Sequence, residues 1–170
     1  FSGKIALVTG ASTGLGEGIA KHLFQLDATV IITGRNRASL EHTAKSIDQS
    51  GERVIPFVVD VKKPDDVKRS IQFIIEKYGA LHYLVNNAGI TGPHGVLIED
   101  YPLDEWQAVI DTDISGTFYG LKYGIPAIVQ SGGGAVVNIS ACNGITGIAG
   151  IAPYTAAKHA VLGLTRASAL

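Results

Sequence analysis

The sequence predicts an α/β fold, in which a doubly wound parallel sheet carries helices on both faces. Short apolar runs typical of buried strands alternate with segments of helical periodicity along the whole chain. Small and polar residues follow the strands directly, and a glycine-rich turn follows the first one. Because ligands of such sheets bind beyond the carboxyl ends of the strands, these residues are expected to line one cleft.

Composition favours a single domain over residues 1–170. The chain is 46% hydrophobic and 17% charged, which is sufficient for one core. A net charge of −1 without a Lys/Arg cluster argues against nucleic acid or membrane as partner and favours a small molecule. The single cysteine, Cys142, cannot form an internal disulfide, is interpreted as a small packed thiol, and suits the cytoplasm. The five histidines lack metal-ligand spacing, so no metal is expected.

The amino-terminal half is expected to contain three strands, each followed by a helix. Leu and Ile residues recur at helical spacing after the glycine-rich turn, and Pro64 stands where proline is tolerated at a helix start. The expected strands are 5–8, 28–33 and 54–59, and the expected helices are about 14–25, 37–50 and 64–79.

The carboxyl-terminal half is expected to add strands at 81–85 and 135–140 and helices that begin near 103 and at Tyr154. Gly116, Gly120 and Gly124 lie four apart on the first of these helices, which predicts a face for close packing, and Pro126 should bend its end. No stop signal precedes the end of the last helix, so we expect the chain to be cut inside a helix and its C-terminal part to be missing.

The turn after the first strand has the spacing Gly-x-x-x-Gly-x-Gly, formed by Gly10, Gly14 and Gly16. Glycine lets a ligand approach the main chain closely, and the free N–H groups of the next helix favour an anion. A pyrophosphate is the expected ligand. The alternative is a tight strand-to-helix turn that binds nothing.

Tyr154 and Lys158 stand four residues apart and therefore share one face of a helix. A nearby ammonium favours the phenolate, so we expect Lys158 to lower the tyrosine pKa toward neutral pH. Such a tyrosine can exchange a proton with a carbonyl oxygen while a nicotinamide cofactor delivers hydride. The alternative is an exposed pair without a catalytic role.

Together, Thr9-Gly10, Gly14-Leu15-Gly16, the segment 86–89 (Asn-Asn-Ala-Gly) and the segment 154–158 (Tyr-Thr-Ala-Ala-Lys) resemble the short-chain dehydrogenase/reductase (SDR) family over essentially the whole chain. The resemblance implies a Rossmann fold, a carbonyl or alcohol substrate, and hydride transfer between a ketone and a secondary alcohol. It also implies a homo-oligomer, a dimer or tetramer, which would suit the glycine row. Further strand and helix units would follow Leu170.

The resemblance also assigns roles to residues. Tyr154 would be the general acid/base, and Lys158 would hold the nicotinamide ribose and tune the tyrosine. The pyrophosphate would be held by Gly10, Ser12, Thr13, Gly14, Leu15 and Gly16. The adenine would contact Asp60 and Val61, and the adenosine and its ribose would contact Asn87, Ala88 and Gly89.

The end of the second strand favours NADP over NAD. The residues there are Thr33-Gly34-Arg35-Asn36, with no acid to accept the ribose 2′-hydroxyl. An arginine can bind a 2′-phosphate, so Arg35 is the expected contact. The alternatives are NAD as cofactor and an Arg35 that points into water.

Two positions depart from the family pattern. The family has a serine thirteen residues before the tyrosine, where this chain has Ala141, and Ser140 could substitute only through a bulge or altered turn. The family usually has asparagine where this chain has Asp113, and the resemblance implies that this residue helps a water relay reach the lysine. If the relay uses the backbone carbonyl, Asp113 keeps that catalytic role, but its carboxylate would raise the tyrosine pKa. The second hypothesis is therefore a silent or disabled nucleotide-binding member of the family.

Overall fold

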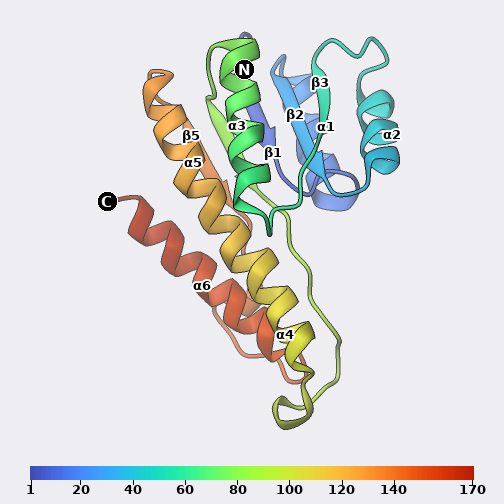
Figure 1. Ribbon diagram of the computed structural model, residues 1–170, viewed down its shortest axis with the longest axis vertical. Helices are drawn as coiled ribbons and strands as arrows, with labels where there is room; N and C mark the ends of the chain where they lie inside the picture. Colours follow the sequence, from blue (N-terminus) through green and yellow to red (C-terminus); the bar gives the residue numbers. More distant parts are fainter.

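Five parallel strands form one sheet in the computed structural model, which describes residues 1–170 (Figure 1). The strand order is β3-β2-β1-β4-β5, so the order reverses between β1 and β4. The strands are β1 (Ile5–Val8), β2 (Thr29–Gly34), β3 (Val54–Val58), β4 (Tyr83–Asn86) and β5 (Ala135–Asn138). The parallel sheet expected from the sequence is confirmed.

Helices connect the strands and cover both faces of the sheet. They are α1 (Gly14–Gln25), α2 (Arg37–Ile47), α3 (Pro64–Tyr78), α4 (Leu103–Val109), α5 (Gly116–Gln130) and α6 (Ala152–Ser168). A π-helical turn, Ile110–Ser115, joins α4 to α5, and a short 3-10 turn, Cys142–Gly144, follows β5. No helix is both long and apolar enough to span a bilayer.

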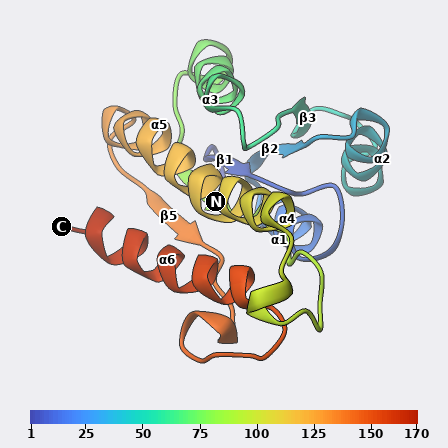
Figure 2. The same ribbon diagram turned by 60° about the horizontal axis from the view of Figure 1, so that its bottom comes forward.

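The core is divided into two halves by the sheet. One half packs α1 and α2 against side chains such as Val8, Val30 and Ile32, and the other packs α3 and α5 against Leu7, Ile31 and their neighbours. Figure 2 shows α3 and α5 on one side of the sheet and α6 on the other. The strand ends are thereby left open between the layers.

The glycine row of α5 packs against the chain's own sheet. A Cβ at Gly116 would lie 2.9 Å from Val61 Cγ2, and one at Gly124 would lie 2.5 Å from Leu84 Cδ2. The row is a close-packing face, as expected, but its partner is internal. Our interpretation of this row as suited to a partner subunit is therefore wrong.

Helix α2 ends three residues before the expected position, because Asp48 organises the following turn. Its carboxylate accepts hydrogen bonds from the backbone N–H groups of Ser50, Arg53 and Val54 at 2.7–3.2 Å, and from the Ser50 hydroxyl at 2.6 Å. Burial disfavours the ionised form, but these hydrogen bonds outweigh it and hold the pKa of Asp48 at about 2. Asp48 thus links the end of α2 to the start of β3.

Asp48→Asn is expected to lower the free energy of unfolding at pH 7 by about 1–3 kcal/mol. The substitution replaces a charged carboxylate, whose two oxygens accept several N–H hydrogen bonds, by a neutral amide with one acceptor oxygen. Since the folded-state pKa is about 2 and the ordinary value is 3.8, the stabilisation is complete above about pH 4 and disappears as the pH falls toward 2. Urea unfolding of both proteins at pH 7 and pH 2.5 measures this. A difference that is equal at the two pH values would contradict the assignment.

Candidate functional site

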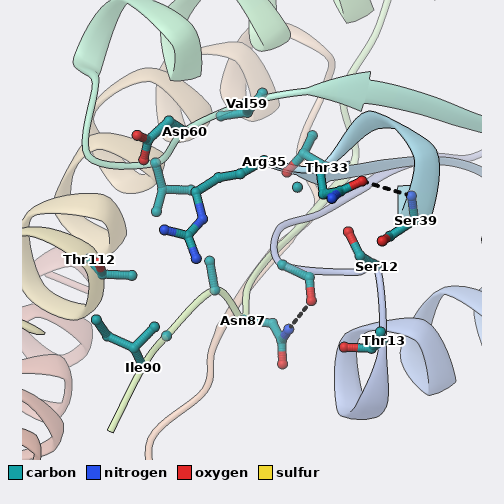
Figure 3. Close-up of a pocket in the computed structure, with 16 residues that line it drawn as sticks. Ser12, Thr13, Thr33, Arg35, Ser39, Val59, Asp60, Asn87, Ile90 and Thr112 are labelled. Atoms are coloured by element: carbon teal, nitrogen blue, oxygen red, sulfur yellow. Dashed lines mark hydrogen bonds between the residues drawn. The ribbon is translucent and has the colours of Figure 1, made fainter. Parts of the chain in front are cut away.

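A polar cavity of about 490 Å³ lies at the carboxyl ends of β1, β2, β3 and β4 (Figure 3). This is the edge at which the strand order reverses, where ligands of doubly wound sheets bind. Residues expected there from the sequence line it: Gly10, Ser12, Thr13, Arg35, Asp60, Val61, Asn87, Ala88 and Gly89. Thr33, Gly34 and Asn36, which flank Arg35 at the end of the second strand, line the cavity as well. Sequence reasoning missed four further lining residues: Ser39, Val59, Ile90 and Thr112.

The glycine turn between β1 and α1 requires its glycines. Gly10 and Gly14 have φ of +63° and +62°, which disfavours other residues. A Cβ at Gly10 would lie 2.7 Å from Ala88 Cα, and one at Gly16 would lie 2.5 Å from the carbonyl oxygen of Gly10. No side chain caps the first turn of α1, so its N–H groups are available to an anion.

The segment after β4 is tied to this turn by hydrogen bonds. The Asn87 side chain donates to the carbonyl oxygens of Thr9 and Gly10, both at 3.0 Å. The Thr9 hydroxyl accepts from the main-chain N–H groups of Asn87 and Ala88 at 3.0 and 3.1 Å. Thr9 belongs to the Thr9-Gly10 motif of the sequence. Its hydrogen bonds to the segment after β4 could not be predicted, because β1 and β4 are far apart in the sequence.

Arg35 lies at the end of the cavity formed by β2. Figure 3 shows its side chain extending over the cavity, with the guanidinium turned toward the side of Thr112. Arg35 forms none of the ion pairs of the chain. The neighbouring Asn36 is occupied in capping α2, since its Oδ1 accepts from the Ser39 N–H at 3.0 Å.

A second cavity, of about 570 Å³, contains Tyr154 and Lys158. It is lined by Leu15 from α1 and Ile139 from the end of β5, and it shares Asn87, Gly89 and Ile90 with the first cavity. The two cavities therefore adjoin each other at these three residues. The structure places the glycine turn and the Tyr154–Lys158 pair on the same edge of the sheet.

Lys158 is held by Asp113 and by the main chain. Its Nζ lies 3.1 Å from Asp113 Oδ2, donates to the carbonyl oxygen of Ile139 at 3.1 Å, and lies 5.2 Å from the centre of the Tyr154 ring. Asp113 Oδ1 accepts from the Ile90 N–H at 2.8 Å. The Asp113 side chain is fully buried and that of Lys158 is 5% exposed.

The pKa of Tyr154 is raised above its ordinary value, so the expected lowering by Lys158 is wrong. Burial is the main cause, and electrostatic repulsion from Asp113 and Cys142 adds to it. Lys158 does not offset these effects because its ammonium is paired with Asp113. Burial also raises the pKa of the Asp113 carboxyl, although Lys158 and the Ile90 N–H oppose this.

The turn after β5 places Ser140 away from the cleft. The Ser140 hydroxyl is occupied, because it donates to the carbonyl oxygen of Lys158 at 3.0 Å, and neither Ser140 nor Ala141 lines either cavity. This geometry argues against Ser140 as a substitute for the absent serine. Ala141 follows in an extended conformation, so its side chain faces away from that of Ser140.

Cys142 is exposed, so its interpretation as a packed thiol is wrong.

Comparison with known sequences decides the family. The family model described as short chain dehydrogenase matches residues 4–170. The chain belongs to the short-chain dehydrogenase family. Its sequence is 37% identical over 170 residues to cyclohexanol dehydrogenase of Acinetobacter sp. (strain SE19), covering 100% of this chain and 67% of that protein.

Solved structures of other short-chain dehydrogenases have the same fold. Actinorhodin polyketide ketoreductase with NADPH superposes with a TM-score of 0.90 at 32% identity, over 96% of this chain and 63% of that one. NAD⁺-bound xylitol dehydrogenase gives a TM-score of 0.94 at 28% identity, over 99% and 64%. This short-chain dehydrogenase chain thus spans just under two thirds of the length of these two structures. Together, the family and these neighbours support a nicotinamide cofactor.

Proposed function

We propose that this short-chain dehydrogenase interconverts a ketone and a secondary alcohol with NADP(H), with Tyr154 as the general acid/base. The observation that carries the proposal is the pair of adjoining cavities, one at the glycine turn and one at Tyr154 and Lys158, which share Asn87, Gly89 and Ile90 as lining residues. The resemblance adds a homo-oligomer as a further prediction, and the single cysteine favours the cytoplasm. The substrate is a small carbonyl or alcohol compound.

The residues present fit a dinucleotide. Positive φ at Gly10 and Gly14 and the uncapped start of α1 shape a cradle for a pyrophosphate. The Thr33 hydroxyl, buried beside the cavity, has no hydrogen-bond partner within the chain. We assign the pyrophosphate to the turn, that is to Gly10, Ser12, Thr13, Gly14, Leu15 and Gly16. We assign the adenosine end to Asp60, Val61, Asn87, Ala88 and Gly89.

The proposed chemistry follows from Tyr154 and Lys158, the two polar side chains of the second cavity. When bound, the nicotinamide supplies or accepts a hydride. The Tyr154 hydroxyl donates a proton to the carbonyl oxygen during reduction and recovers one afterwards. Lys158 has three N–H donors, of which one bonds to the Ile139 carbonyl oxygen, so a further donor is available to a ribose hydroxyl.

NADP is favoured over NAD by Arg35, because its guanidinium lies over the cavity and is unpaired. Arg35→Ala is expected to weaken NADPH binding by about 10- to 100-fold, the value of one hydrogen-bonded charge pair, and to leave NADH binding nearly unchanged. Cofactor fluorescence titration measures both. Arg37→Ala is the matched control, since Arg37 lies nearby but pairs with Glu41. Equal losses for NADPH and NADH would contradict a 2′-phosphate contact.

A second candidate function is a silent member of the family that binds the nucleotide without turnover. It is favoured by Ala141, which offers no hydroxyl, and by the Ser140 hydroxyl, which is directed at α6. NADPH fluorescence and turnover on a panel of ketones separate the two candidates. Binding with turnover supports the reductase, binding without turnover supports the silent protein, and absence of binding would contradict both.

A further inference from the structure

The feature that the proposed function does not use is the buried charge pair beside Tyr154. Asp113 belongs to the π-helical turn between α4 and α5, and Lys158 lies on α6. Such single π-helical turns often occur at functional sites. The turn places a carboxylate against Lys158, which would otherwise be an unpaired cation beside Tyr154.

The pair is held in place from several sides. Asp113 Oδ1 accepts a hydrogen bond from the Ile90 N–H, and the Lys158 ammonium donates one to the Ile139 carbonyl oxygen. Asp113 Oδ2 has no hydrogen-bond partner and lies 3.1 Å from Lys158 Nζ as an ion pair. The loop after β4 passes so closely over the pair that a Cβ at Gly89 would lie 2.8 Å from Asp113 Oδ2 and 3.3 Å from Lys158 Nζ. Neither charged group can move far without displacing this loop.

The charges that face Tyr154 come from three elements. Asp113 approaches from the π-helical turn, Cys142 from the turn after β5, and Lys158 from its own helix, with Nζ 5.2 Å from the ring centre. An isolated ammonium at that distance stabilises the phenolate. The ion pair of the Lys158 ammonium and the Asp113 carboxylate, 3.1 Å apart, has no net charge, so the carboxylate opposes this stabilisation.

We propose that Asp113 is a positioning residue that retains Lys158 in a neutral pair, keeps Tyr154 protonated, and thereby suits the site to carbonyl reduction at neutral pH. This inference rests on the proposed function. Burial and the Asp113 charge both raise the pKa of Tyr154, in agreement with it. The equilibrium of the overall reaction is unaffected; the pH at which each direction is fastest is changed.

The proton balance gives the direction. In reduction, two electrons and one hydrogen move as hydride from NADPH to the carbonyl carbon, and the proton of the Tyr154 O–H bond moves to the carbonyl oxygen. The products are the alcohol, NADP⁺ and a phenolate, which regains a proton from solvent. Oxidation requires the phenolate first, to accept the proton of the alcohol. A raised tyrosine pKa therefore favours the first direction near neutral pH and moves the second to alkaline pH.

The test is the titration of Tyr154 in the full-length protein, followed by NMR of ¹³Cζ-labelled tyrosine, with the signal assigned through Tyr154→Phe. Asp113→Asn keeps the size of the side chain and removes its charge, so the pKa of Tyr154 is expected to fall by about one unit or more. Asp111→Asn is the matched control on the same turn, because the Asp111 carboxylate accepts a hydrogen bond from the Gln107 side chain and is not paired with Lys158. In the Asp111→Asn control, the pKa of Tyr154 is expected to remain as in the unchanged protein.

An unchanged or higher Tyr154 pKa in Asp113→Asn would overturn the inference. Asp113→Ser removes the same charge with a smaller side chain and provides the same readout if the asparagine variant does not fold. Because the titration needs neither cofactor nor substrate, it remains informative if the proposed reaction fails. In the active protein, the acid limb of the pH profile for alcohol oxidation is expected to move down by the same amount, which a merely structural role would not cause.

Discussion

Tyr154→Phe is expected to lower the rate of ketone reduction by about a hundred- to ten-thousand-fold, the usual contribution of a general acid/base. The ring remains, so the packing at the start of α6 is retained and only the hydroxyl is lost. Because the Tyr154 hydroxyl is assigned to the carbonyl oxygen of the substrate, NADPH affinity is expected to change little. Steady-state kinetics and NADPH fluorescence measure the two quantities separately.

Tyr123→Phe is the matched control for this prediction. Tyr123 lies in a surface groove between α3 and α5, on the other face of the sheet from α6. Removing the Tyr123 hydroxyl is expected to leave the rate of ketone reduction unchanged. A Tyr154→Phe variant that retains full activity would contradict the assignment of Tyr154 as the acid/base.

Ala141→Ser is expected to raise the rate of ketone reduction by on the order of a hundred-fold, because one hydrogen-bond donor to a developing oxyanion has about this effect. The side chain at this extended position faces away from Ser140, whose hydroxyl is directed at α6. A serine here would match the family position thirteen residues before Tyr154. The gain is expected in the maximal rate rather than in NADPH affinity.

Cys142→Ser is the matched control for the new hydroxyl. It introduces the same group one residue further along, at an exposed position. We expect no comparable gain in rate from it. No gain from Ala141→Ser, or an equal gain from both variants, would count against the alignment that places residue 141 at the family serine.

Local sequence pattern was sufficient to predict most of the fold. Each apolar run became a strand, and the glycine turn after β1 was recognised because its spacing and its neighbours are local features. The same holds for Pro64, which begins α3 as expected. Errors at element ends arose where a side chain organised the next turn, as Asp48 does after α2.

Long-range packing could not be read from the sequence. A row of small residues packs equally well against a sheet or a partner subunit, so the partner of Gly116, Gly120 and Gly124 was assigned wrongly. The pKa of Tyr154 was misjudged because the carboxylate that pairs with Lys158 comes from a distant turn. In both instances the sequence identified the residues but did not show which groups they meet.

The most direct measurement is a structure of the full-length protein with NADP⁺. The account predicts that the diphosphate lies against the glycine turn at the start of α1 and that the nicotinamide lies beside Tyr154 and Lys158, with the dinucleotide passing Asn87 and Gly89. A dinucleotide bound outside this cleft, or one whose nicotinamide lies away from Tyr154, would contradict it.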